Sequence, residues 1–157
     1  MKPAAIHALI IASFAAAAVW AADTPPGPPP TPKDPALEQA RAAIEQKDWA
    51  RAAGVLRDAV ARNPQDADYH NLYAYSMRMG ENPSMALVFR HYNEALRLKP
   101  RHRGAHEYIG EAYLMSGNLP KAKEHLAQLD KLCFFGCEEY TKLKNAVAAF
   151  EQQQAKR

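Results

Sequence analysis

The sequence predicts an all-α protein in which helix pairs repeat along the chain and stack as a short superhelix. Small residues recur at intervals of 34 or 36 positions, prolines and capping side chains mark helix ends at matching places, and apolar residues lie three and four positions apart. The last segment, 137–157, predicts a single capping helix, because one of its faces is apolar and the other carries charge.

Residues 1–21 have the pattern of a signal peptide. Lys2 gives a positive start, residues 4–19 contain no charged side chain, and the run ends at Ala21 with a proline-rich segment close behind. A membrane anchor is the alternative, but the apolar run is short and no basic flank follows it. No cysteine follows the run either, so a lipid-attachment site is missing. We expect a periplasmic or secreted protein with no stable membrane anchor after processing.

Residues 22–34 predict a proline-rich disordered linker. Seven of the chain's twelve prolines lie between Thr24 and Pro35. Such density fixes φ and removes backbone donors, which favours an extended, solvated spacer. About 120 residues remain, enough for one domain.

Three units follow, at about 35–66, 67–100 and 101–136. Their equivalent positions carry small or compact residues, in sets of three: Ala40, Ala74 and Gly110; Ala52, Val88 and Ala122; Ala59, Ala95 and Leu129. The interval of 36 indicates a two-residue insertion in the second unit, near 81–85. Two helices of this length bury too little apolar surface alone, so the pairs are expected to stack.

Prolines and capping side chains set the expected helix ends. Asp34-Pro35, Asn82-Pro83 and Leu119-Pro120 place proline at a first helical position, and Asn63-Pro64 and Lys99-Pro100 follow helix ends.

These units resemble the tetratricopeptide repeat family over most of the chain after residue 34. The third unit, HEYIGEAYLMSGNLPKA, carries the resemblance best, through Ile109, Gly110, Tyr113, Gly117 and Ala122. Matching residues of the other units are Trp49, Leu56, Ala59, Pro64, Tyr92, Ala95 and Pro100. Lys47 replaces the turn glycine of the first unit, and Gln39 replaces a usual leucine. The closing LCFFGCEEY is similar to the ends of small exported bacterial members of this family.

The chain's two cysteines, Cys133 and Cys137, flank a Phe-Phe-Gly. A disulfide between them fits poorly inside one continuous helix, but Gly136 allows a left-handed turn, so that one cysteine ends a helix and the other begins the next. We interpret the pair as a structural clasp. A reactive thiol pair and a copper site, with His125 or with Met77, Met79 and His70, remain alternatives.

No catalytic motif or phosphate-binding loop occurs, so we predict no enzyme, no catalytic residue and no cofactor or metal site. The formal net charge is +3, and +2 without Lys2. Basic residues are dispersed apart from the short cluster at 99–103, which argues against nucleic acid.

The resemblance implies that the first helix of each pair lines a concave groove that binds a protein or peptide. Transferred to this sequence, the groove residues are Asn71, Tyr75, Arg78, Met79, Glu107, Glu111, Leu114 and Met115. About half of them are expected to pack between repeats. The family's clamp for a terminal carboxylate is not matched. The function predicted is therefore an exported scaffold or adaptor, and the alternative is a periplasmic thiol-redox or copper-handling protein that uses Cys133 and Cys137.

Overall fold

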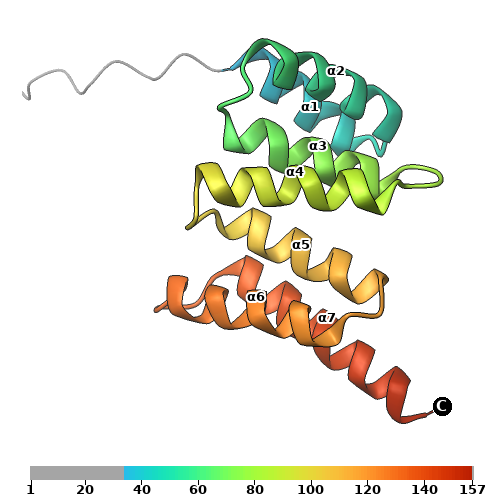
Figure 1. The fold of residues 1–157 in the computed structure, drawn as a ribbon, viewed down its shortest axis with the longest axis vertical. Coiled ribbons are helices and arrows are strands. Elements are labelled where there is room, and N and C mark those ends of the chain that lie inside the picture. The colour runs from blue at the N-terminus through green and yellow to red at the C-terminus, as the bar shows by residue number, and fades with distance from the viewer. Residues whose placement is uncertain (1–33, 157) are drawn as a thin grey trace, which may run out of the picture. The chain divides into compact units, whose positions relative to one another are not determined.

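The computed structural model describes residues 34–156, and within that range it contains seven α-helices and no strand (Figure 1). The helices are α1 (Pro35–Glu45), α2 (Trp49–Arg62), α3 (Ala67–Met79), α4 (Met85–Leu98), α5 (Arg103–Met115), α6 (Leu119–Leu132) and α7 (Glu138–Ala155). This confirms the predicted fold class.

Each helix packs against the next one in the chain. Contacts also join α1 to α3, α3 to α5 and α5 to α7. The first helices of the three pairs and α7 therefore lie in a row, and α2, α4 and α6 form a second layer against them. We call the surface of α1, α3, α5 and α7 the A-helix face.

Three apolar clusters fill the spaces between successive pairs. They centre on Leu56, on Tyr92 with Ile109, and on Leu129 with Leu143, all of them fully buried. The third cluster contains Leu143 and Val147 of α7. The last helix thus covers apolar surface that the third pair would otherwise expose.

A carboxylate or amide caps most of the helices. The side chains of Asp34, Asp48, Asp66 and Asn118 accept hydrogen bonds from backbone N–H groups in the first turns of α1, α2, α3 and α6. These bonds satisfy donors that have no partner inside a helix.

The expected start of the fourth helix was wrong by two residues. Pro83 precedes the helix, Ser84 is its N-cap, and α4 begins at Met85. Asn82 has a positive φ of 50°, so the inserted residues form a turn that ends before the proline instead of a cap. At the start of α6, Pro120 occupies the second helical position, behind Leu119.

The signal peptide predicted at 1–21 and nearly all of the linker predicted at 22–34 lie outside the described residues. Among residues 34–156, no helix combines the length and the hydropathy that a bilayer crossing requires.

Candidate functional site

The eight predicted groove residues all lie on α3 and α5, two neighbouring helices of the A-helix face. Asn71, Arg78, Glu107 and Leu114 are buried. The other four reach the surface to different degrees: Tyr75 and Glu111 partly, Met79 at 41% and Met115 at 57% exposure. Half of the set therefore packs into the protein and half remains available to a partner.

A polar cavity of about 240 Å³ opens where α1, α3, α5 and α7 meet. Its lining combines acidic, basic and amide side chains: Arg41, Asp68, Asn71, Leu72, His102, Gly104, Glu107, Tyr108, Glu138, Glu139 and Lys142. We call it the polar cavity. Two of the predicted groove residues, Asn71 and Glu107, line it, and both are more than nine-tenths buried.

Several charges of the polar cavity are paired. Asp68 Oδ1 lies 2.8 Å from His102 Nε2, and this contact lowers the pKa of Asp68, while partial burial works in the opposite direction. Lys142 Nζ lies 2.7 Å from Glu138 Oε1 and 4.0 Å from Glu107 Oε1. The lysine ammonium is thus held chiefly by the exposed carboxylate, and Glu107 has only a distant cation.

Burial raises the pKa of Glu107 to about 7. This value includes the smaller effects of Lys142, which lowers the pKa, and of the carboxylates of Glu111, Glu139 and Glu138, which raise it. A carboxyl group in this position changes charge near neutral pH.

A second cavity, of about 400 Å³, lies beside the C-terminal halves of α3 and α5. The wall that α7 contributes to it is mostly apolar. Its lining residues are Arg78, Glu111, Leu114, Met115, Ala146, Ala149, Phe150 and Gln153. We call it the apolar cavity. Four of the predicted groove residues line it. Arg78 Nη2 lies 2.6 Å from Glu111 Oε2, and its guanidinium group lies 5.5 Å from the ring centroid of Tyr75. This buried arginine fixes the wall between α3 and α5.

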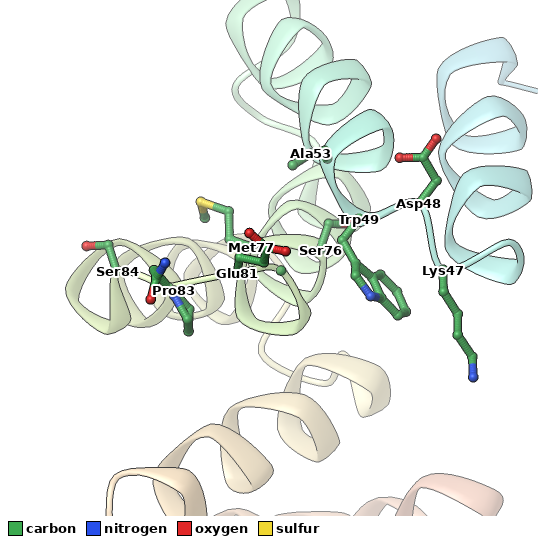
Figure 2. Close-up of a pocket in the computed structure, with 12 residues that line it drawn as sticks. Lys47, Asp48, Trp49, Ala53, Ser76, Met77, Glu81, Pro83 and Ser84 are labelled. Carbon is green, nitrogen blue, oxygen red and sulfur yellow. The ribbon is translucent and has the colours of Figure 1, made fainter.

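A third cavity, of about 530 Å³, lies at the α1–α2 turn and the loop after α3 (Figure 2). Trp49, Met77 and Pro83 give it apolar walls, and the two-residue insertion of the second repeat supplies part of its rim. Trp49 also packs edge-on against Tyr75, with ring centroids 5.8 Å apart. The sequence analysis placed the insertion but not this cavity.

The two cysteines lie at the junction of α6 and α7. Cys133 is the C-cap of α6 and Cys137 the N-cap of α7, and their sulfur atoms are joined across a turn in which Gly136 has φ +83°. Phe134 and Phe135 on that turn are 87% and 97% exposed. The sulfurs and the Glu139 carboxylate lie within 4.8 Å of one another, but paired sulfurs offer no thiolate to a metal.

The other residues considered for copper are placed elsewhere. Nδ1 of His70 lies 2.9 Å from Nδ1 of His91, and Nδ1 of His125 lies 2.9 Å from Nδ1 of His106. Each histidine is thus occupied by another histidine. Among the described residues, the group of possible ligand atoms around the two cysteines does not include His125. Met77 and Met79 lie about two turns or more beyond His70 on α3.

Sequence reasoning found Asn71 and Glu107 but missed the rest of the polar cavity. Asp68 and His102 precede the main stripe of their helices, and Glu138, Glu139 and Lys142 were interpreted only as features of a capping helix. These residues come together only through the packing of the helices, which no spacing in the sequence indicates. Because α7 packs on α5, and α5 on α3, the first turn of α7 continues the A-helix face.

Comparisons with known proteins agree with this architecture. A tetratricopeptide repeat family model matches residues 37–84 and 90–131, together more than half of the chain. No curated protein matched the sequence.

Solved structures show the same fold at low sequence identity. The TPR2B domain of yeast Sti1, in a complex with pHsp70, is 18% identical, with a TM-score of 0.65 over 75% of this chain and 94% of its own. The type III secretion chaperone SycD of Yersinia enterocolitica, in complex with a peptide of the translocator YopD, is 15% identical, with a TM-score of 0.62 over 78% and 97%. A TPR protein of Thermus thermophilus is 21% identical, with a TM-score of 0.63 over 79% and 67%. The chain belongs to the tetratricopeptide repeat family.

Proposed function

We propose that the protein is a non-enzymatic scaffold or adaptor that binds a protein or peptide segment on its A-helix face. The observation that carries this proposal is the pair of neighbouring cavities on that face, one polar and one apolar. Together they offer buried polar groups that fix orientation and apolar surface that supplies affinity.

The spacing of the two cavities suits a polypeptide. Glu107 of the polar cavity and Leu114 of the apolar cavity are two turns apart on α5, which corresponds to about 10 Å along the helix. Three residues of extended chain span the same distance. A single peptide segment could therefore place one side chain in each cavity. The yeast Sti1 domain and SycD, which share the fold, are described in complexes with pHsp70 and with a YopD peptide.

Export is part of the proposal. The first 21 residues support it through their short positive start and uncharged apolar run, and a proline-rich spacer would then hold the repeats away from the processed N-terminus. In an oxidising compartment the joined Cys133 and Cys137 would act as a structural clasp between α6 and α7.

Selection from a random peptide library displayed on phage tests the binding function. The bait is the purified protein, and the comparison uses Met115→Glu, which places a charge in the apolar cavity. Because Met115 is 57% exposed, this change should leave folding intact. We expect enriched peptides to lose at least about tenfold in affinity for that variant, since the new carboxylate would lie where an apolar side chain of the partner packs.

Leu87→Glu is the matched control. Leu87 is 43% exposed and lies on α4, away from the A-helix face. Peptides should bind this variant as they bind the parent protein. A library that yields no peptide, or peptides that are equally sensitive to both variants, would refute the proposed function.

A further inference from the structure

The polar cavity contains one buried acceptor without an internal partner and one buried carboxylate whose ion pair is long. Oδ1 of Asn71 is buried and has no hydrogen-bond partner in the described part of the chain, and the residue is 4% exposed. Glu107 is 3% exposed, and its nearest cation is Lys142 Nζ at 4.0 Å. A buried polar atom without a partner costs free energy, as does a buried carboxylate without a close counterion.

Two of the cations around the cavity are held by carboxylates other than Glu107. Lys142 lies closer to Glu138, at 2.7 Å, and Arg103, next to the cavity, lies 3.6 Å from Glu139. His102 contacts Asp68. Arg41 lines the opposite wall and is exposed to solvent. The lining thus holds four carboxylates against two permanently charged cations.

Gly104 leaves open the space beside the Asn71 amide and the His102 ring. A Cβ at this position would lie 3.4 Å from Nδ2 of Asn71 and 3.5 Å from Cε1 of His102, which is ordinary contact distance. A side chain here would therefore fit the fold but would fill space in front of the amide.

We propose that the polar cavity binds the cationic side chain of a lysine or arginine residue of the partner polypeptide, next to Asn71 and Glu107. Such a group donates several hydrogen bonds and carries the charge that a buried carboxylate lacks. This inference rests on the proposed function, of which it specifies one subsite, and the excess of carboxylates is the charge complementarity that selects a basic partner residue.

Titration with N-acetyl-arginine methylamide, followed by NMR, tests the inference. N-acetyl-citrulline methylamide is the control, because its side chain has nearly the same shape without the charge. N-acetyl-lysine methylamide tests the ammonium group. The side-chain carboxyl carbon of Glu107 provides the readout. We expect the arginine and lysine probes to lower the pKa of Glu107 by at least about one unit, whereas the citrulline probe should leave it unchanged.

Two variants and one control locate the subsite. Glu107→Gln should weaken binding of the arginine probe about tenfold, because it removes the charge at nearly constant shape. Gly104→Ala should weaken it by obstruction while leaving every charge in place. Glu124→Gln is the control, since Glu124 is exposed on α6 and lines neither the polar nor the apolar cavity.

Equal binding of the arginine and citrulline probes would overturn the inference, as would arginine binding that neither Glu107→Gln nor Gly104→Ala reduces. Failure here is distinguishable from failure of the proposed function. Library peptides that bind the A-helix face without a basic residue would refute the cation subsite and leave the scaffold intact. Binding of the arginine probe without any enriched library peptide would support the cation subsite and refute the scaffold function.

Discussion

Nδ1 of His70 on α3 lies 2.9 Å from Nδ1 of His91 on α4. Nε2 of His70 lies 3.1 Å from the carbonyl oxygen of Pro64, which can only accept a hydrogen bond. His70 therefore carries its proton on Nε2 when neutral, and Nδ1 of His91 donates to Nδ1 of His70. Two neutral rings in defined tautomers join the helices of the second repeat.

The third repeat contains the same arrangement. Nε2 of His106 donates to the carbonyl oxygen of Pro100 at 3.0 Å, and its Nδ1 accepts from Nδ1 of His125 at 2.9 Å. These positions follow the repeat intervals of 36 and 34. Each pair thus links the preceding proline turn, the first helix and the second helix of its own repeat.

The histidine pairs should make folding sensitive to acid. Burial, together with the charge of the partner histidine, lowers the pKa of His91 and of His125 to about 4. Between pH 4 and the ordinary value of 6.5 the unfolded chain binds more protons than the folded one. The contribution of each of these two histidines should therefore be complete above pH 6.5 and be lost as pH drops toward 4, by up to roughly 3 kcal/mol per histidine. Urea unfolding at a series of pH values measures this change.

Substitution His91→Asn separates this effect from other titrations. Asparagine can donate from a similar position but does not titrate, so the variant should lose less stability between pH 6.5 and 4 than the parent protein does. Adding His125→Asn should flatten the profile further. A profile that both substitutions leave unchanged would show that other groups cause the acid sensitivity.

Two helical glycines should respond in opposite ways to substitution by alanine. At Gly110 in α5, a Cβ would lie 2.6 and 2.8 Å from the two methyl carbons of Leu143, which is fully buried in α7. Gly110→Ala should therefore destabilise the protein by about 1–2 kcal/mol in spite of its better helix propensity. At Gly54 in α2, a Cβ would meet nothing within 4 Å. Gly54→Ala should stabilise it by about 1 kcal/mol. Thermal unfolding of both variants checks the pair, and a stabilised Gly110→Ala would mean that α7 packs differently on α5.

Gly110 also shows which features of helix packing could be predicted from the sequence. Repeat spacing predicted where compact residues recur, because each helix crossing needs one, and this fixed the fold class and the three helix pairs. It could not predict which crossing is tightest. That depends on Leu143, which lies 33 positions away on a helix outside the repeat pattern.

The candidate site was predictable only in part for a similar reason. Positions on α3 and α5 follow from helical periodicity, so Asn71 and Glu107 could be located. Their burial and the lack of a close partner depend on where Lys142 and His102 point, and no spacing rule contains that information. The start of α4 was misplaced because Asn82-Pro83 has the local pattern of a cap, and only the left-handed backbone at Asn82 shows that it forms a turn.

A backbone change at Lys47 should stabilise the first repeat. Lys47 has φ +58°, a left-handed conformation in which a side chain is strained, whereas the equivalent turn of the third repeat uses Gly117 at φ +74°. Lys47→Gly should raise the free energy of unfolding by about 0.5–1 kcal/mol, after the extra entropy of glycine in the unfolded chain is subtracted. The reciprocal Gly117→Lys should lower it, since no atom within 4 Å of the Cβ position would add a packing effect. Urea denaturation of both variants tests this, and a destabilised Lys47→Gly would indicate that the lysine side chain makes a contact worth more than the strain.

The cysteine pair predicts a defined redox state and a modest contribution to stability. The protein isolated from its native compartment without reductant should contain no free thiol, and its intact mass should be lower by two hydrogens than that of the reduced chain. Cys133→Ser with Cys137→Ser should lower stability by only about 2 kcal/mol, because the bridge closes a short loop. Peptide binding should persist, since neither cysteine lines the polar or the apolar cavity. Two free thiols, or a bound copper or zinc ion in the measured mass, would instead support the redox or metal function.

Glu107 should produce a pH dependence opposite in sign to that of the histidine pairs. Its pKa is raised from 4.5 to about 7, so between these values the folded protein binds more protons than the unfolded chain does. The contribution of this group is complete below pH 4.5 and is lost as pH rises through 7, by up to roughly 3 kcal/mol. Glu107→Gln stays neutral at every pH, so it should remove this loss and make the protein more stable than the parent at pH 8, with little difference at pH 4.5. Urea unfolding at the two pH values measures both effects, with Glu124→Gln, at an exposed carboxylate on α6, as the control. A Glu107→Gln variant that is less stable at pH 8 would mean that the carboxylate is ionised and held by Lys142. The cation of a partner would then not be required to neutralise Glu107.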